Sequence, residues 1–401
     1  MKELKYMQTF EALLYQANND LVRQAKESGK KVIGYTCYHM PEVLLNLEGC
    51  FSVRLRAPQT GSMEVATYYM SNATCEYARA LLERALEGGY NFLDGLAGVD
   101  CCECMNRSIE NMELLDALGK DNKGFFNCNM DVPCTDNEDA VEHVVEQVSR
   151  KVLKPLSENY NIDISDKAIR LAVKKQNEVS KIITDLAEFK KSLFPQLTGY
   201  EYFIITLVTF VCPKDLLLDM LYETLEEVKN RKPDEKSKYR ARVVLVGSEI
   251  DDPELIKLIE DNGAYVAADR FCYGSIPGRE EIVLNDEEDA LTQVVRHYLV
   301  NTLCVRHVVR HKTQKRLDTV ASLVKEYNAD GVIYEQMKFC TYWSYERALS
   351  SHIMQNEYNI PTLSIDRPYM SRSSGQLRTR VQAFVENLEI KKIKARRKEA
   401  K

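Results

Sequence analysis

The chain has 401 residues, of which 45% are hydrophobic, and a formal net charge of −6. This length predicts two or three domains, and the negative charge argues against a general nucleic-acid-binding protein, which usually carries a basic domain. No stretch approaches 18 uncharged apolar residues, and the N-terminal segment lacks the apolar core and cleavage site of a signal peptide. We therefore expect a cytoplasmic protein with no nucleic-acid and no membrane partner.

The first part of the chain alternates helical and strand patterns. Residues 1–30 have an amphipathic helix pattern, and strands are expected at 31–35, 53–56, 91–99 and 124–130. Such alternation indicates βαβ units around a parallel sheet. We therefore place a first α/β domain at residues 31–136, after an N-terminal helix.

Helical patterns with long charged faces dominate residues 137–238, which we interpret as a helical connector or subdomain. A charged, proline-containing segment at 229–238 marks its end. A second α/β domain at 239–390 has strands expected at 242–248, 264–269, 331–336 and 361–366, and a basic tail follows at 391–401. The predicted fold is therefore α/β, with two Rossmann-like, doubly wound, mainly parallel sheets joined by a helical connector.

Twelve cysteines are many for a cytoplasmic chain, where thiols stay reduced and serve more often as metal ligands or in catalysis. Some of the twelve are expected to be small buried apolar residues. Others follow predicted strands, where ligands bind in doubly wound sheets; these are Cys101, Cys102, Cys104, Cys272 and Cys340. Cys75 begins a predicted helix, whose dipole favours a thiolate.

The spacing of these cysteines leaves the metal open. Cys101 and Cys104 have the C-x-x-C spacing of a structural zinc site, which Cys128 and Cys134 would complete. Iron–sulfur clusters are also held by thiolates at strand or helix ends. Zinc, an iron–sulfur cluster and unligated thiols all remain compatible with the spacing.

Five stretches resemble one known family: VIGYTCYHMPEVLLNLEGC at 32–50, ATCEYAR at 73–79, CCECMNR at 101–107, MKFCTYW at 337–343 and GQLRTRVQAFVE at 375–386. They are similar in order and spacing to the 2-hydroxyacyl-CoA dehydratase and benzoyl-CoA reductase group, of the 2-hydroxyglutaryl-CoA dehydratase D-component type. The likeness extends from about residue 30 to 388.

The resemblance implies a 4Fe–4S cluster held by Cys75, Cys102 and Cys340, with Cys101 and Cys104 as alternates for the middle ligand. It also implies a lyase that removes water from a 2-hydroxyacyl-CoA through a ketyl radical. A homologous second subunit would complete a heterodimer, and a separate ATP-hydrolysing iron–sulfur activator would supply one electron. The absence of a Walker A segment agrees with an ATPase on another polypeptide.

Other functions stay open beside this one. A double-cubane-cluster reductase of small molecules needs more ligands, for which Cys128, Cys272 and Cys304 are available. A non-catalytic accessory subunit and a zinc-binding structural protein are further alternatives.

Three further residues are candidates for catalysis or substrate binding. Glu42 follows Pro41 and is a candidate acid–base group, although a surface carboxylate is the more common role. Gln376 and Arg380 start a predicted helix and are candidates for binding the thioester or for packing. His39 is expected to be an exposed turn residue.

Overall fold

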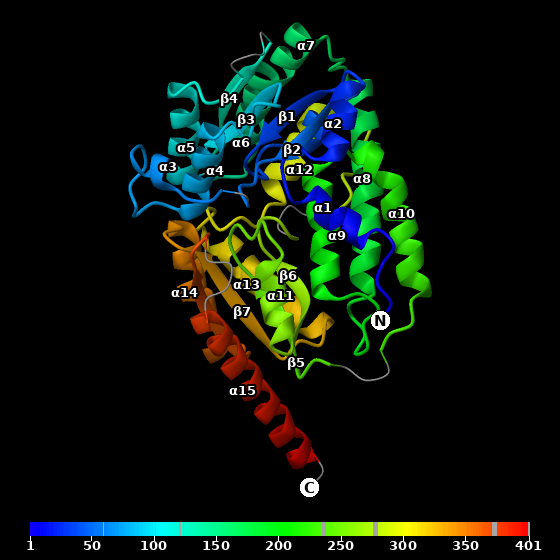
Figure 1. Ribbon diagram of the computed structural model, residues 1–401, viewed down its shortest axis with the longest axis vertical. Helices are drawn as coiled ribbons and strands as arrows, with labels where there is room; N and C mark the ends of the chain where they lie inside the picture. Colours follow the sequence, from blue (N-terminus) through cyan, green and yellow to red (C-terminus); the bar gives the residue numbers. More distant parts are fainter. Residues whose placement is uncertain are drawn as a thin grey trace.

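The computed structural model describes residues 1–58, 60–100, 102–119, 122, 124–234, 238–275, 280–370 and 375–399. Two four-stranded sheets, each fully parallel, are surrounded by helices within this part of the chain (Figure 1). The predicted α/β class with two Rossmann-like sheets is therefore confirmed.

The first sheet has the strand order β2-β1-β3-β4. Its strands are β1 (Lys31–Tyr35), β2 (Cys50–Arg54), β3 (Gly95–Asp100) and β4 (Phe126–Asp131). Its neighbouring helices are α2 (Asp20–Glu27), the short 3-10 helix η1 (Glu42–Leu45), α3 (Glu64–Thr67), α4 (Glu76–Leu86), α5 (Glu103–Leu114) and α6 (Glu138–Val148). Because helices cover the sheet, β1, β2 and β3 are almost entirely buried and have nearly continuous apolar sequences.

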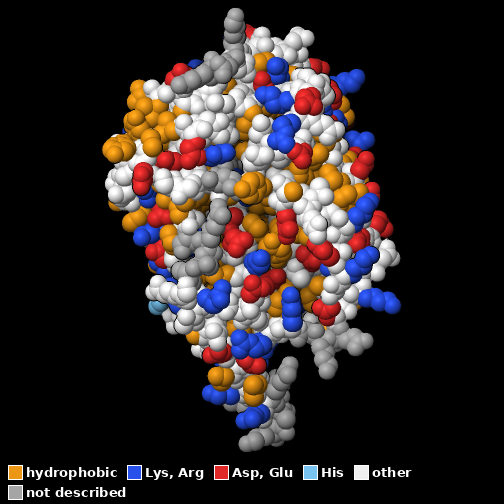
Figure 2. Space-filling model, viewed as in Figure 1, with side chains coloured by type: hydrophobic (Ala, Val, Ile, Leu, Met, Phe, Trp, Pro, Cys, Tyr) orange, Lys and Arg blue, Asp and Glu red, His pale blue; other side chains and the backbone are white. Residues whose placement is uncertain are grey.

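The second sheet repeats this order as β6-β5-β7-β8. Its strands are β5 (Ala241–Val246), β6 (Ala264–Arg270), β7 (Gly331–Met337) and β8 (Thr362–Arg367). The helices around it are α11 (Glu254–Asp261), α13 (Arg310–Glu326), α14 (Thr341–Asn356) and α15 (Gly375–Glu399). The end of α15 projects from the body and carries Lys and Arg side chains (Figures 1 and 2).

Four helices lie along one side of the molecule, beside both sheets (Figure 1): α1 (Met7–Leu13), α8 (Asp166–Glu188), α9 (Gly199–Val211) and α10 (Lys214–Asn230). The π-helix η2 (Ser149–Leu153) and α7 (Lys154–Tyr160) instead continue α6 and pack near β4 of the first sheet. Helix α9 is buried along most of its length and contacts both β2 and β6. None of the described helices is long and apolar enough to cross a membrane.

Helix α12 (Ala290–Val300) lies between β6 and β7 in the chain but packs beside the first sheet. It contacts α6 and α8, and its Val294 and Tyr298 share a core cluster with Ile33 of β1 and Val99 of β3. The two halves of the chain are therefore interleaved rather than stacked end to end.

The carboxyl ends of the two sheets face each other across the middle of the molecule. Arg54, at the end of β2, reaches the carboxylate of Glu249 and the carbonyl oxygen of Cys272, which follow β5 and β6. The hydroxyls of Tyr77 and Tyr273 are 2.9 Å apart across the same boundary. In doubly wound folds, ligands bind where the strand order reverses, which here is between β1 and β3 and between β5 and β7.

Candidate metal centre

Three cysteines stand immediately before three helices. Cys75 is the N-cap of α4, Cys102 of α5 and Cys340 of α14. Helices α5 and α14 follow β3 and β7, the strands at the two reversal points. The sulfur of Cys102 accepts the backbone N–H of Met105 at 3.4 Å. A helix N-terminus favours negative charge, so all three positions favour a thiolate.

These thiols come from distant segments but influence one another's ionisation. Burial raises the pKa of the Cys75 thiol, and the thiols of Cys102 and Cys104 raise it further. Burial also raises the pKa of Cys340 well above its ordinary value, and Cys75 and Cys102 add to the effect. The structure thus brings the predicted ligands together, in a group that we call the thiol site: Cys75, Cys102, Cys104 and Cys340.

Backbone N–H groups at the starts of α4 and α14 oppose this rise in pKa. Those of Ala78 and Tyr77 lower the pKa of Cys75, and that of Trp343 lowers the pKa of Cys340. A bound cation would act in the same direction and more strongly, because a thiol that binds a metal loses its proton.

The alternates for the middle ligand have different positions. Cys104 is in the first turn of α5; burial raises its pKa, and the backbone of Cys75 lowers it. Cys101 lies outside the described residues. The Cys102 thiol raises the pKa values of both Cys75 and Cys340, so it is close to both.

The arrangement differs from a site for one metal ion. Across the described ranges, no three His, Cys, Asp or Glu side chains are grouped so that they could hold a single ion. In a cluster with several irons, each thiolate binds a different iron, so the sulfurs are spaced more widely than ligands of one ion. Three mutually interacting thiols at helix N-termini fit the ligands of such a cluster. Backbone N–H groups near the sulfurs are among the features that set the reduction potential of iron–sulfur clusters.

A surface hollow of about 650 Å³ opens beside Cys340. Its lining combines Ala73, two residues before Cys75, with Gln336, Lys338, Phe339 and Tyr345 around the start of α14. A small molecule can therefore reach the thiol site from this side.

Two of the additional cysteines form a second group. Burial raises the pKa of Cys272, and Glu249, Cys304 and Cys37 raise it further. Burial and then Cys37 raise the pKa of Cys304. Cys128 is elsewhere, buried in β4, where burial raises its pKa to about 12 and Lys151 opposes the rise.

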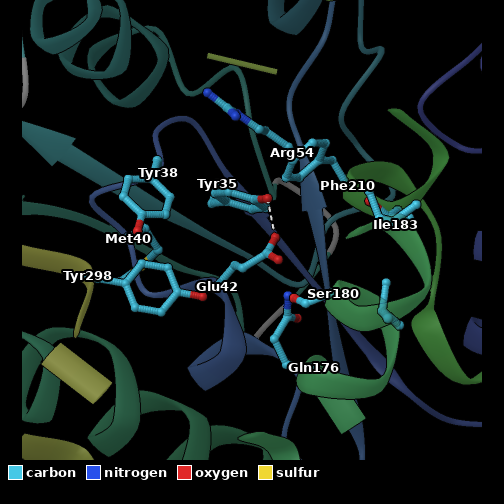
Figure 3. A pocket seen from close by; sticks show the side chains of 12 residues that line it. Tyr35, Tyr38, Met40, Glu42, Arg54, Gln176, Ser180, Ile183, Phe210 and Tyr298 are labelled. Carbon is cyan, nitrogen blue, oxygen red and sulfur yellow. Dashed lines mark hydrogen bonds between the residues drawn. The ribbon is translucent and has the colours of Figure 1, made fainter. Parts of the chain in front are cut away.

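Glu42 lines an interior cavity of about 40 Å³ between the first sheet and α8 (Figure 3). Its carboxylate accepts a hydrogen bond from the hydroxyl of Tyr35 and lies 3.3 Å from the Nζ atom of Lys214. Glu42 is therefore a buried, paired carboxylate. The Arg54 guanidinium borders the same cavity and points away from the Tyr35–Glu42 pair (Figure 3).

The remaining candidates are placed differently. Gln376 and Arg380 are exposed at the start of α15, and Arg380 donates to the backbone oxygen of Ser364 in β8. The expectation for His39 is wrong: its side chain is only 3% exposed and stacks on His307 with ring centroids 5.6 Å apart. A short turn after β1 puts His39 inside because the second half of the chain covers it.

Glu249 was not among the predicted site residues. It follows β5, as Cys340 follows β7, and Glu249 raises the pKa of Cys340. Its position just past a buried parallel strand is the sequence signal that indicates a place at this edge of the sheet.

The chain is similar to known proteins along most of its length. Residues 37–388 match the family described as 2-hydroxyglutaryl-CoA dehydratase, D-component. The chain is 22% identical to the (R)-phenyllactyl-CoA dehydratase beta subunit of Clostridium sporogenes, over 96% of this chain and 99% of that protein. It is 24% identical to the (R)-2-hydroxyglutaryl-CoA dehydratase subunit beta of Acidaminococcus fermentans, over 92% of this chain and 95% of that protein. The chain therefore belongs to the 2-hydroxyglutaryl-CoA dehydratase D-component family.

Proposed function

We propose that this chain is the iron–sulfur subunit of a 2-hydroxyacyl-CoA dehydratase, with Cys75, Cys102 and Cys340 as ligands of a 4Fe–4S cluster. Family membership indicates a dehydratase component, and full-length relatives named as beta subunits imply a partner subunit. The single observation that supports the cluster best is the proximity of three cysteines at helix N-cap positions, which come from both halves of the chain.

When bound, such a cluster supplies one-electron chemistry and a Lewis-acidic iron. The chain's own groups would hold it and control its surroundings. Helix N-termini stabilise the three thiolates, and Trp343, 3% exposed, helps to exclude water beside Cys340. The hollow next to Cys340 would admit the acyl group of the thioester.

The reaction we infer is removal of water from carbons 2 and 3 of a 2-hydroxyacyl-CoA by a ketyl-radical route. One electron would come from a separate ATP-hydrolysing activator, and a homologous subunit would complete a heterodimer. Loss of water from the acyl-CoA, followed by mass spectrometry in the presence of both partners, tests this activity.

The cluster is tested by preparing the protein without oxygen and measuring iron, acid-labile sulfide and zinc per chain. We expect about four iron and about four sulfide. Zinc without sulfide would reject the proposal.

The second thiol group supports one alternative, a double-cubane-cluster reductase of small molecules. Cys37, Cys272 and Cys304 influence one another's pKa values and would supply additional ligands. The same measurement separates the two functions, because a double cubane would give about eight iron per chain.

A further inference from the structure

A cavity of about 310 Å³ lies between the two halves of the chain, and we call it the α1–α9 cavity. Its lining residues lie around the end of α1, at the start of α9 and in the loops that follow β2, β5 and β8: 11–15, 200–204, 56–58, 60, 252–254 and 369–370. Ligands of doubly wound folds bind at the carboxyl ends of strands, and small-molecule sites usually have volumes of about 300–1,000 Å³. The cavity shares no lining residue with the hollow beside Cys340, so it is a separate candidate site.

Arg56 is the buried charged residue of this lining and is 5% exposed. Its Nε atom donates to the carbonyl oxygen of Asp251 at 2.6 Å, and its Nη1 atom donates to that of Leu14 at 3.0 Å. These two bonds fix the guanidinium between the end of α1 and the loop after β5. They leave the Nη2 atom without an acceptor among the residues that the structure describes. A fixed arginine N–H is a donor suited to a carboxylate.

The charge of Arg56 is partly balanced from behind the cavity wall. Asp251 is fully buried and accepts a hydrogen bond from the Tyr369 hydroxyl at 2.6 Å. Burial raises the pKa of Asp251 to about 6, and Arg56 opposes that rise. Arg56 therefore offers the cavity a directed N–H donor without being an unbalanced buried charge.

Thr60 places an unused hydroxyl in the same lining. It is 2% exposed, and its Oγ1 atom has no hydrogen-bond partner within the described chain. Its backbone N–H donates to the carbonyl oxygen of Ala57 at 3.2 Å, in a tight turn directly after Arg56. A buried hydroxyl without a partner lowers stability, and a ligand that accepts a hydrogen bond from it would remove that cost.

The outer part of the cavity is acidic. Its lining includes three carboxylates: Glu11, Asp252 and Glu254. Glu11 and Glu254 are exposed, and the side chain of Asp252 is 23% exposed. Two cations lie nearby: Arg367 is 3.7 Å from Asp252, and the Lys257 Nζ atom is 5.9 Å from the centre of the Tyr200 ring. The three carboxylates exceed these two cations, so this rim favours a positively charged group.

The acidic rim and Arg56 belong to the same part of the cavity. Asp252 directly follows Asp251, whose carbonyl oxygen accepts the Nε–H of Arg56. The other walls are apolar and aromatic: Leu14, Tyr15, Tyr200, Ile204, Tyr369 and Met370. Tyr15 is 65% exposed, so a ligand in the cavity would cover part of its ring.

We propose that the α1–α9 cavity binds a small zwitterion with an apolar body, the class formed by free α-amino acids with aliphatic side chains. The Nη2 atom of Arg56 and the Thr60 hydroxyl would donate to its carboxylate, and the acidic rim would hold its ammonium group. The apolar walls would contact its side chain. This inference goes beyond the proposed function and does not depend on the cluster.

Isothermal titration calorimetry of the full-length chain, prepared without oxygen, tests the site with three probes of similar shape. L-leucine carries both charges, isopentylamine lacks the carboxylate, and 4-methylpentanoate lacks the ammonium group. We expect L-leucine to bind and each of the other two to bind at least about tenfold more weakly, because each loses one set of charge-assisted hydrogen bonds.

Two variants locate the binding. Thr60→Val keeps the shape of the side chain and removes the hydroxyl, and Glu254→Gln keeps its size and removes one rim charge. Each should weaken L-leucine binding severalfold, and circular dichroism checks that each variant is folded. The control is Glu158→Gln, which removes a carboxylate that is 62% exposed on α7 and should bind L-leucine like the wild type.

No binding of L-leucine at concentrations up to about 10 mM would overturn the proposal. Equal binding of isopentylamine would also overturn it, because the cavity would then hold only a cation. L-leucine binding that is unchanged in both variants would place the ligand elsewhere on the protein. Iron and sulfide are measured on the same samples, so a chain that binds L-leucine but holds no cluster would reject the proposed function alone.

Discussion

Cys102 and Cys104 are two positions apart at the start of α5, but they interact with different neighbouring thiols and backbone groups. The thiol of Cys102 raises the pKa values of both Cys75 and Cys340 and accepts the N–H of Met105. Cys104 instead is influenced most, after burial, by the backbone of Cys75. Cys102 is therefore the better placed of the two to share a cluster with both other ligands.

We expect Cys102→Ala to lose most of the bound iron and sulfide, because one of three thiolate ligands is removed. Cys104→Ala should keep most of both. Iron, sulfide and visible absorbance of anaerobically reconstituted variants measure this difference. The opposite ranking would move the ligand from Cys102 to Cys104.

A buried ion pair between Arg316 of α13 and Glu346 of α14 holds the N-terminal half of α14 against α13. Both guanidinium nitrogens of Arg316 that face Glu346 donate to its carboxylate, at 2.9 and 2.8 Å, and the two side chains are 0% and 3% exposed. Removing one partner leaves the other charge buried and unpaired. The pair joins α13 to α14, which carries Cys340 at its N-cap.

Glu346→Ala should lower the free energy of unfolding by about 3–5 kcal/mol, measured by urea denaturation. The control is Glu158→Ala, because Glu158 forms an exposed pair with Lys154 whose side chains are 62% and 64% exposed. That variant should change the free energy by less than about 1 kcal/mol. If the two variants lowered the free energy of unfolding equally, burial of the Arg316–Glu346 pair would not be the reason for its contribution to stability.

At the scale of elements, the turn from β7 to α14 has an unusual backbone. Phe339 has φ of 66°, a left-handed conformation, and is 40% exposed. The other non-glycine residues with positive φ in the described chain are Asn or Asp, which tolerate this region better. A bulky residue held in this conformation directly before Cys340 is the kind of strain that accumulates at functional sites.

Phe339→Gly should be more stable than Phe339→Ala by about 1 kcal/mol, because glycine adopts positive φ without a steric penalty. Both variants remove the ring, so their difference isolates the backbone. Thermal and urea unfolding of the two variants provide the comparison. Equal stabilities would show that φ at this position relaxes when the ring is removed.

The strands and their cysteines were predictable because local patterns specify them. Buried parallel strands are apolar runs, and the residues after them lie at one edge, which is why Cys340 was found beside its strand. The meeting of Cys75, Cys102 and Cys340 came from the family resemblance, because proximity between distant segments depends on packing. The position of Glu249 and the burial of His39 could not be predicted for the same reason, because both depend on contacts with residues from the other half of the chain.

On the scale of the whole molecule, a histidine pair links the two halves of the chain. Burial, and to a smaller extent the charge of Arg306, lower the pKa of His307 to about 4. Burial, then Arg306 and His307, lower the pKa of His39 well below its ordinary value. Both rings are therefore neutral in the folded protein at pH values where an unfolded histidine, with a pKa of about 6.5, gains a proton.

Because the unfolded chain binds more protons below that value, the stability contributed by neutral His39 is complete above about pH 6.5 and is lost as the pH falls. Relative to His39→Phe, which keeps a ring but cannot ionise, the wild type should lose about 1.4 kcal/mol for every pH unit below about 6. Urea unfolding between about pH 5 and about pH 8 measures this difference. Parallel stability curves for the two proteins would contradict a neutral buried His39.

The return of α12 to the first sheet has a consequence for any attempt to cut the protein in two. A fragment ending near the linker at 229–238 would lack the helix whose Val294 and Tyr298 belong to the same core cluster as Ile33 and Val99. It would expose that apolar surface to water and aggregate. The chain can therefore be divided at this linker only if both pieces are present together and assemble, so that the second piece supplies the missing helix.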